Sequence, residues 1–250
     1  MTERARTILY VGSAVIALTA MLYGAARMQP FGSFTGEYTQ RLLRVAWPQR
    51  HVENVPTAVN FDYRAMDTFG EEFIFFTSVV GVVVLFSGLG GPAERRREPL
   101  DEEWNRRQTG GLRWFATGLT AFILAMGMDI GAHGQLTPGG GFQGGAIFGG
   151  GFACLYLGLG LGTFLKLAKK ERFDPLESLG AFAFAATGVA AMVVSGFFLA
   201  NVLPLGITGA TVSGGTIYVL SCAVFVEIGC GFIVLLYEFL RQTGETPERQ

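Results

Sequence analysis

Thr137-Pro-Gly-Gly-Gly-Phe-Gln-Gly-Gly-Ala-Ile-Phe-Gly-Gly-Gly-Phe152 is the stretch that decides the fold. Half of its residues are glycine, although glycine costs a water-exposed helix on the order of 1 kcal/mol per residue relative to alanine. Inside a bilayer, small residues spaced four apart allow helix backbones to approach closely. Two such ridges are present at helical spacing: Gly141, Gly145, Gly149 and Ala153, and then Gly150, Cys154, Gly158 and Gly162. The stretch therefore predicts a transmembrane helix that is surrounded by other helices.

Thr137 and Pro138 indicate where this helix begins. A threonine side chain can cap the first turn, and proline suits the first helical position. We therefore expect the helix to begin at Pro138. The residues expected to set its packing are Pro138, Gly139, Gly140, Gly141, Phe142, Gly144 and Gly145.

The composition excludes several classes of protein. The chain has 250 residues, of which 50% are hydrophobic and 16% charged, and its mean hydropathy is +0.39. This is not the composition of a soluble globular domain, and a formal net charge of −1 gives no reason to expect nucleic-acid binding. The three cysteines lie in apolar runs without the spacing of a metal site. We expect them to be small packing residues, and we expect neither a metal nor a cofactor on this chain.

Six apolar segments are long enough to cross a bilayer, which takes about 20 residues. They are Ile8–Met28, Phe69–Leu89, Leu112–Ile130, Phe142–Leu165, Leu176–Leu203 and Val212–Leu240. Arg4 and Arg6 before the first segment also fit a signal peptide, but that apolar run is longer than usual and no clear cleavage site follows it. We therefore expect an uncleaved first helix and an all-α integral membrane protein with about six transmembrane helices.

The Lys and Arg residues indicate the orientation, because cytoplasmic loops are enriched in positive charge. Most of the 19 lie near the two termini and in the segments Gly90–Gly111 and Lys166–Pro175. The exceptions lie in or beside the long segment Gln29–Thr68, where the rule is weaker and a short interfacial helix is weakly indicated. We expect both termini to be cytoplasmic. The mixed-charge stretch 91–111 is expected to be a cytoplasmic linker, and 242–250 a polar tail.

Arg64, Asp67 and Glu71 are the densest group of charges at a membrane entrance. Ionisable residues inside a membrane are costly, and each is a functional candidate. These three are spaced i, i+3 and i+7, so they share one face of a helix. An arginine flanked by carboxylates can form a local ion pair, and a remaining carboxylate can exchange a proton or bind a small cation. An ordinary salt-bridge cluster at a helix entrance fits the spacing equally well.

Other acidic residues also lie in or near the apolar segments. Glu227, near the middle of the last segment, fits either a proton relay lining a wet cavity or a neutral acid that donates a hydrogen bond to a backbone carbonyl. Asp129 and His133 bracket the end of the third segment, and because histidine titrates near neutral pH they fit either a proton entrance or an ordinary loop. Glu177 and Glu238 lie near helix ends, where we expect both to contact water.

Two motifs resemble segments of known membrane-protein families. His133-Gly-Gln-Leu-Thr-Pro-Gly-Gly-Gly-Phe-Gln-Gly-Gly145 resembles the signature of MnhB, also called MrpB, a small subunit of Mrp-type multisubunit Na+/H+ antiporters. Phe61-Asp-Tyr-Arg-Ala-Met-Asp-Thr-Phe-Gly-Glu71 resembles a segment near the C-terminal end of the large MrpA subunit, which is a separate subunit, MbhE, in membrane-bound hydrogenases. The resemblance divides the chain into an MbhE-like part at 1–90, with two spans and a long outer loop, and an MnhB-like part at 112–241, with four spans.

The resemblance implies a subunit of a multisubunit Na+/H+ antiporter in the inner membrane of a prokaryotic cell. Such a subunit is not itself an enzyme and contributes to the ion pathway and to assembly. The implied partners are other Mrp-type or hydrogenase-type membrane subunits, with Na+ and H+ as the transported ions. The resemblance places Arg64, Asp67 and Glu71 in the region of the ion pathway, to which the physical arguments above add Glu227, His133 and Asp129. The alternatives are the same module in a redox complex, such as a membrane-bound hydrogenase or formate hydrogenlyase, and a purely structural scaffold.

Overall fold

The computed structural model describes residues 3–28, 32–33, 36–87 and 110–243 of the chain. Every regular element in this part of the chain is a helix, which confirms the expected all-α class. The elements are α1 (Glu3–Ala26), α2 (Glu37–Arg50), α3 (Val55–Ala58), the π-helical turn η1 (Val59–Tyr63), α4 (Ala65–Ser87), α6 (Gly110–Ala132), α7 (Gly141–Leu167), α8 (Lys170–Ser195) and α9 (Thr216–Thr243). The chain forms two compact units, Met1–Arg41 with α1 and Leu42–Gln250 with the helical bundle. Nearly all of the expected linker 91–111 and tail 242–250 lies outside the described residues.

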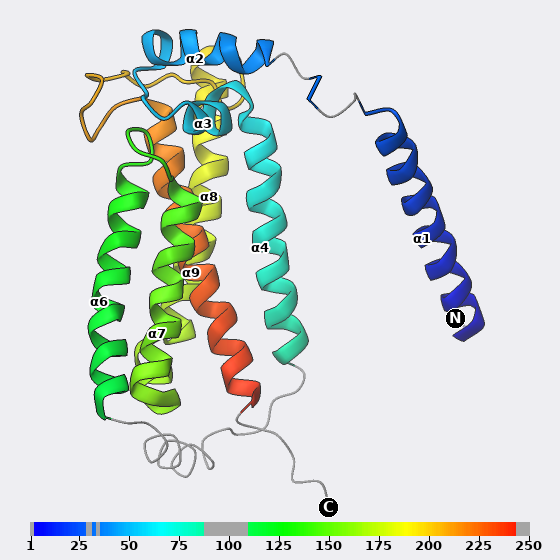
Figure 1. The fold of residues 1–250 in the computed structure, drawn as a ribbon, viewed down its shortest axis with the longest axis vertical. Coiled ribbons are helices and arrows are strands. Elements are labelled where there is room, and N and C mark those ends of the chain that lie inside the picture. The colour runs from blue at the N-terminus through cyan, green and yellow to red at the C-terminus, as the bar shows by residue number, and fades with distance from the viewer. Residues whose placement is uncertain (1–2, 29–31, 34–35, 88–109, 244–250) are drawn as a thin grey trace, which may run out of the picture. The chain divides into compact units, whose positions relative to one another are not determined.

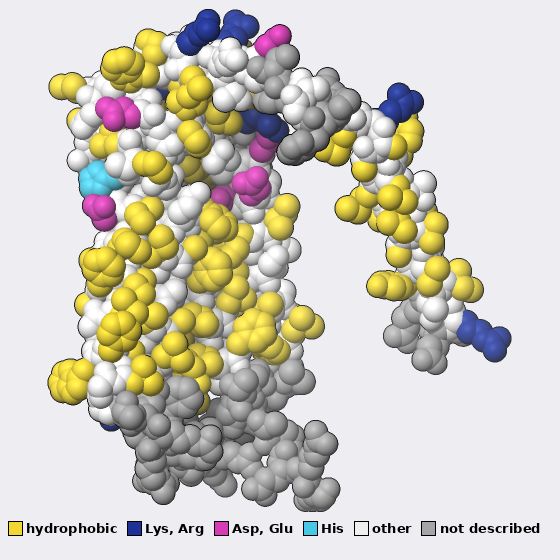
Figure 2. Space-filling model, in the orientation of Figure 1, with side chains coloured by type: hydrophobic (Ala, Val, Ile, Leu, Met, Phe, Trp, Pro, Cys, Tyr) yellow, Lys and Arg dark blue, Asp and Glu magenta, His cyan; other side chains and the backbone are white. Residues whose placement is uncertain are grey.

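Among the described residues, six helices are long and apolar enough to cross a membrane, namely α1, α4, α6, α7, α8 and α9. In the bundle unit the long helices run alongside one another, and η1, α3 and the loop 196–215 gather at one end, which we call the η1 end (Figure 1). The opposite end of the bundle, where α8 begins, is called the Lys170 end. Figure 2 shows hydrophobic side chains along the flank of this bundle and charged side chains gathered at the η1 end. The cytoplasmic location of the termini stays a prediction.

Glycines at the helix ends correct the predicted boundaries of the last two spans. α8 stops at Ser195 rather than continuing to Leu203, because Gly196 adopts a left-handed conformation with φ 81° and ends the helix. The chain then forms a loop, and α9 begins at Thr216 rather than Val212. The two residues before it, Gly214 and Gly215, have φ values of 83° and 63°, which non-glycine residues rarely adopt.

The expected helix start at Pro138 is wrong. α7 begins at Gly141, since Gly139 and Gly140 have φ values of 135° and 152°, outside the helical range. The hydroxyl of Thr137 donates to the carbonyl of His133 at 3.3 Å instead of capping α7. Thr137 and Pro138 therefore belong to the loop between α6 and α7.

The glycines inside α7 do pack closely. In the first predicted ridge, Gly141, Gly145 and Gly149 all contact α9, whereas the second ridge is not packed at every position. A Cβ added at Gly145 would come within 2.9 Å of the backbone nitrogen of Gly229 and the backbone oxygen of Phe225, both in α9. One added at Gly144 would come within 2.7 Å of the backbone oxygen of Gly127 in α6. Gly150, by contrast, has no described neighbour within 4 Å of such a Cβ, so the second ridge is wrong at that position.

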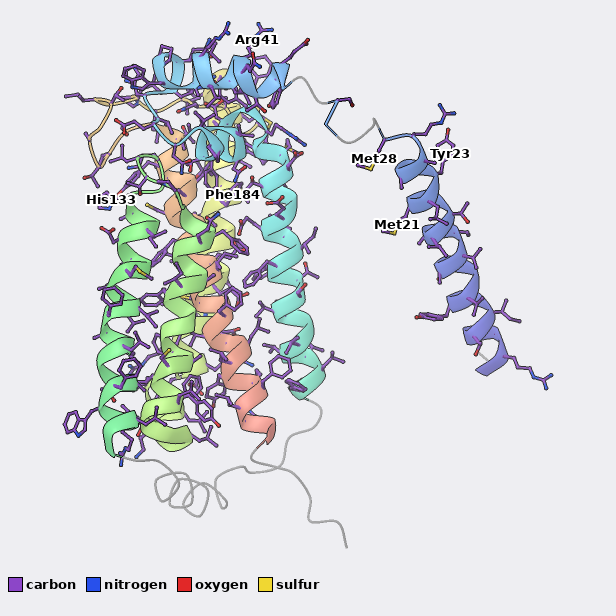
Figure 3. All side chains as sticks on the ribbon, viewed as in Figure 1. Met21, Tyr23, Met28, Arg41, His133 and Phe184 are labelled. Carbon is purple, nitrogen blue, oxygen red and sulfur yellow. The ribbon has the colours of Figure 1, made fainter. Side chains whose placement is uncertain are left out.

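Phenylalanine rings attach α4 to the C-terminal helices. The ring of Phe69 lies 6.1 Å from that of Phe184 in α8, and the ring of Phe75 lies 5.5 Å from that of Phe232 in α9. Phe184 is fully buried and points into the bundle (Figure 3). This aromatic contact brings the first half of the sequence against α8 and α9, which is where the buried charges lie.

Candidate functional site

Three glutamates from three helices are buried inside the bundle. The exposed fractions are 2% for Glu72 in α4, 1% for Glu177 in α8 and 0% for Glu227 in α9. Both carboxyl oxygens of Glu227, and one each of Glu72 and Glu177, lack a hydrogen-bond partner within the described part of the chain. The carboxyl of Glu227 interacts electrostatically with those of both Glu72 and Glu177. Burial of polar groups without partners is costly, so the arrangement calls for a functional explanation.

Glycines on the facing helix lie against two of these glutamates. α8 and α9 pack against each other, and a Cβ at Gly180 of α8 would lie 2.6 Å from the backbone nitrogen of Glu227. Reciprocally, a Cβ at Gly231 of α9 would lie 3.4 Å from the carboxyl carbon of Glu177. Gly180 therefore lets the backbones of α8 and α9 approach closely at Glu227. Gly231 lies beside the Glu177 carboxyl at ordinary contact distance, and its missing side chain makes room mainly for the ring of Phe75 in α4, 2.5 Å from such a Cβ.

A fourth buried glutamate lies nearer the Lys170 end. Glu238 in α9 is 2% exposed, and its Oε1 lies 2.7 Å from Nζ of Lys170 in the first turn of α8. Glu238 comes eleven positions after Glu227 in α9, so the two lie on nearly the same face of that helix, about 16 Å apart along its axis. The buried acids thus follow one side of α9 toward the end of the bundle.

Asp174 lies between these two levels on α8. Lys170, Asp174 and Glu177 are spaced i, i+4 and i+7, which puts them on one face of that helix. The carboxyl of Asp174 interacts electrostatically with that of Glu177. Because Asp174 is only half-buried, it connects the inner carboxylates with the surface at the Lys170 end.

A cavity of about 200 Å³ lies at the other end of the series, between α4 and the start of α7. Glu71 and Glu72 both line it, together with polar groups that include Thr57, Thr68 and Gln143. Its remaining wall contains the backbone of Gly139, Gly140 and Gly141. Glu72 is therefore a buried acid that lines a polar cavity and interacts electrostatically with Glu227.

The glycine motif forms this cavity wall because a polar clamp holds the loop before α7 in place. The side-chain amide of Asn54 donates to the carbonyls of Gly134, Thr137 and Gly139 at 2.7, 2.8 and 3.2 Å. The hydroxyl of Thr57 donates to the same carbonyl of Gly134 at 2.7 Å. The clamp joins the segment before η1 to this loop. The two motifs found in the sequence meet at the cavity, which is lined by Phe61 and Glu71 of one and by Gly139 of the other.

The three charges predicted to share a face near η1 lie at the start of α4 and are exposed. Arg64 and Asp67 form an ion pair with each other, and their side chains are 60% and 52% exposed. Glu71 lines the cavity but is itself exposed, whereas its neighbour Glu72 is buried. Asp62, earlier in the same motif, pairs with Arg50 and accepts a hydrogen bond from the amide of Asn201.

The described side-chain contacts of His133 and Asp129 are with each other and not with the buried carboxylates. Nδ1 of His133 lies 3.0 Å from a carboxylate oxygen of Asp129, and the Asp129 side chain is 72% exposed. His133 directly follows the end of α6, in the loop before α7, and it is not in the interior of the bundle, where Phe184 lies (Figure 3). Their predicted role at a proton entrance stays a prediction.

Sequence reasoning missed three of the four buried glutamates. The expectation that Glu177 and Glu238 contact water is wrong, because both are almost fully buried between α8 and α9. Glu72 was passed over in favour of Glu71. The spacing of the sequence contained a signal for its burial, since Glu72 lies at helical spacing from Ala65, Thr68 and Val79, which form the buried face of α4. Glu177 likewise lies at helical spacing from Gly180, Ala181, Phe184 and Gly188 of the buried face of α8.

Comparison with known proteins places the second half of the chain in a family. Residues 112–234 match the family model described as a domain related to the MnhB subunit of Na+/H+ antiporter. An uncharacterised protein of Methanocaldococcus jannaschii is 28% identical over 191 residues, which cover 73% of this chain and 70% of that protein.

Two solved structures share the fold. A chain of the Mrp complex from Dietzia sp. DQ12-45-1b matches with a TM-score of 0.68 and 22% identity, over 95% of this chain but only 26% of that much longer chain. A chain of the membrane-bound sulfane sulfur reductase, an archaeal respiratory membrane complex, matches with a TM-score of 0.69 and 25% identity, over 94% of this chain and 98% of that chain. Residues 112–234 are thus an MnhB-related domain of the kind found in Na+/H+ antiporters, carried by a multi-pass protein of the prokaryotic cell membrane.

Proposed function

We propose that this chain is a non-catalytic subunit of a cation/proton antiporter-type membrane complex and that it contributes part of the ion pathway. The MnhB-related domain supports the class of complex, with Na+ as the expected cation. Partner subunits are expected to supply the rest of the pathway, because the similar chain in the Mrp complex is far longer than this one.

The observation that carries the proposal is the burial of Glu72 and Glu227 without hydrogen-bond partners for three of their four carboxyl oxygens, counted over the described residues. A charge or polar group in a membrane interior is costly, and such residues mark ion or proton pathways. Glu72 also lines the polar cavity, which gives the buried acids a route toward water. A scaffold would need neither the burial nor the cavity.

A redox-coupled complex is the second candidate, and one observation favours it. This chain and a chain of the sulfane sulfur reductase complex cover each other almost end to end at 25% identity. In such a complex the same buried acids would serve ion movement that is driven by a neighbouring redox subunit.

Affinity purification through a tag on this chain tests which complex it belongs to. Co-purification of large antiporter-like membrane subunits, without iron–sulfur subunits, is expected for the antiporter. Recovery of iron–sulfur subunits with the chain would instead support the redox-coupled complex.

Proton movement in membrane vesicles that contain the assembled complex tests the role of the acids. Glu72→Gln is expected to reduce Na+-dependent proton exchange by about tenfold or more, because it removes a positioned proton-accepting group. Glu171→Gln, an exposed carboxylate on α8, is the matched control and is expected to leave exchange unchanged. Unchanged exchange in Glu72→Gln, with the complex intact on a native gel, would identify the chain as a scaffold.

A further inference from the structure

We propose that the buried carboxylates of this chain form a proton relay through the bundle, which begins at Glu72 in the cavity, passes through Glu227 and Glu177, and leaves beside Asp174 and the Lys170–Glu238 pair. This inference rests on the proposed function. It names the proton as the ion that this chain carries, gives the order in which the acids pass it on, and places the two ends of the path. Glu72 is the first acid of the relay, at its entrance. It is 2% exposed and lines the cavity, and one of its carboxyl oxygens has no hydrogen-bond partner in the described chain.

The order of the residues follows from their electrostatic contacts and their register on the helices. Glu72 lines the cavity together with Val224, which lies one turn before Glu227 on α9. Gly180, one turn after Glu177 on α8, lies against the backbone of Glu227. Glu227 also interacts electrostatically with both acids, so it is the central member. Glu177 lies against Gly231, one turn further along α9 than Glu227, and interacts in turn with Asp174. Among the described residues, the buried acids that interact with Glu227 come from α4 and α8, and both belong to this series.

The surroundings of Glu227 favour a proton over a sodium ion. Sodium, like other hard cations, needs several oxygen ligands at once. Glu227 is instead flanked by Ala223, Val224 and Ile228 of the apolar core, and the glycine facing it on α8 has no side chain. The carboxyl of Glu227 also interacts electrostatically with those of Glu72 and Glu177, but no three His, Cys, Asp or Glu side chains among the described residues lie together in a way that could hold a metal ion. A carboxyl group in this position can therefore hold a proton and pass it on, but it lacks the ligands that would surround a cation. The cavity, with its hydroxyl and amide groups, is the one described part of the route where oxygen ligands gather.

Each step of the relay moves one proton and no electrons. The O–H bond of a protonated carboxyl breaks as a new O–H bond forms on the next carboxylate, directly or through one water molecule. The Lys170–Glu238 pair lies at the exit, where Nζ of Lys170 donates a hydrogen bond to Oε1 of Glu238 at 2.7 Å. A proton that reaches Glu238 neutralises it and releases Lys170, which is 25% exposed and can turn to water.

Two transport measurements on the intact complex in proteoliposomes test the ion. One follows proton movement driven by a Na+ gradient with an internal pH dye. The other follows exchange of labelled Na+ for unlabelled Na+ at equal pH, which requires no net proton movement. Glu227→Gln and Glu177→Gln are expected to reduce the first by about tenfold or more and to leave the second within about twofold. Glu171→Gln is the control for both.

An infrared measurement tests the connection between the acids even where no transport is coupled to Na+. The carboxylic C=O band that Glu227→Gln removes belongs to Glu227, and its shift in D2O reports how fast that proton exchanges. A double variant, Glu72→Gln with Glu177→Gln, is expected to slow this exchange by about tenfold or more, because both neighbours that deliver the proton are removed.

The outcomes separate the relay from the proposed function. Loss of both transport signals in Glu227→Gln would mean that Na+ follows this route, which overturns the proton assignment and leaves the antiporter function standing. Retention of both signals would overturn the relay. If the wild-type complex moves no protons with Na+, the antiporter function fails, and the deuterium exchange then decides the relay alone: slowed exchange in the double variant supports it, and unchanged exchange overturns it.

Discussion

Replacement of Glu227 by leucine should stabilise the protein, because the buried carboxyl has nothing to bind. Glu227 is fully buried, and neither of its carboxyl oxygens has a hydrogen-bond partner among the residues the structure describes. Burial of a polar group without a partner costs about 1–3 kcal/mol in protein mutational data. Leucine has a similar volume and adds apolar contact with the surrounding core. We therefore expect the free energy of unfolding to rise by about 1–3 kcal/mol.

Equilibrium unfolding of the purified full-length chain in mixed micelles, with increasing fractions of denaturing detergent, measures this change. Glu238→Leu is the matched control, because it lies on the same face of the same helix but removes a carboxylate that is paired with Lys170. It should destabilise the protein by about 1–3 kcal/mol, less than for a fully buried pair because Lys170 is 25% exposed. Destabilisation of more than about 1 kcal/mol by Glu227→Leu would refute the reasoning and would indicate that Glu227 donates a structural hydrogen bond.

Two further predictions concern the packing and the clamp. Gly145→Ala should destabilise the bundle by about 1–3 kcal/mol relative to Gly150→Ala on the same helix, because its Cβ would come within 2.9 Å of the α9 backbone while that of Gly150 meets nothing within 4 Å. The same detergent titration measures both, and equal stabilities would contradict the packing argument. Asn54→Ala should cost about 1–3 kcal/mol, since it removes the side-chain donor to the part-buried carbonyls of Thr137 and Gly139 in the loop before α7. It should also speed protease cleavage in the loop 133–140; cleavage as slow as in the wild-type protein would show that the clamp does not hold the loop.

The transmembrane spans could be predicted because span length is a property of the local sequence. A bilayer requires a long apolar run, and the runs are visible without any knowledge of how the helices pack. Boundaries were less accurate where single glycines decide them. Gly196 and Gly140 end or delay a helix through their own φ angles, which the apolar pattern does not contain. The glycine ridge at Gly145 was predictable for the same reason as the spans, since its spacing is local.

The buried acids were harder to predict, because burial of a helix face depends on its neighbours. Glu71 and Glu72 are adjacent and point about 100° apart on α4, so one is exposed while the other is buried in the bundle. The choice of Glu71 rested on its spacing from Arg64 and Asp67, but those residues pair at the surface. Phe69 and Phe75 set the side of α4 that contacts α8 and α9, and a single sequence does not reveal which helices they meet.

The glycines and the carboxylates depend on each other. A carboxylate between two helices of ordinary spacing would lie in a gap that water can fill, and it would be a solvated surface charge. Gly180 lets α8 approach the α9 backbone at Glu227, and Gly231 lets the ring of Phe75 pack beside the Glu177 carboxyl. This close packing leaves both carboxyl groups buried. A proton held in such a niche can leave only toward the next acid, so close packing of this kind is what turns separate glutamates into an ordered path.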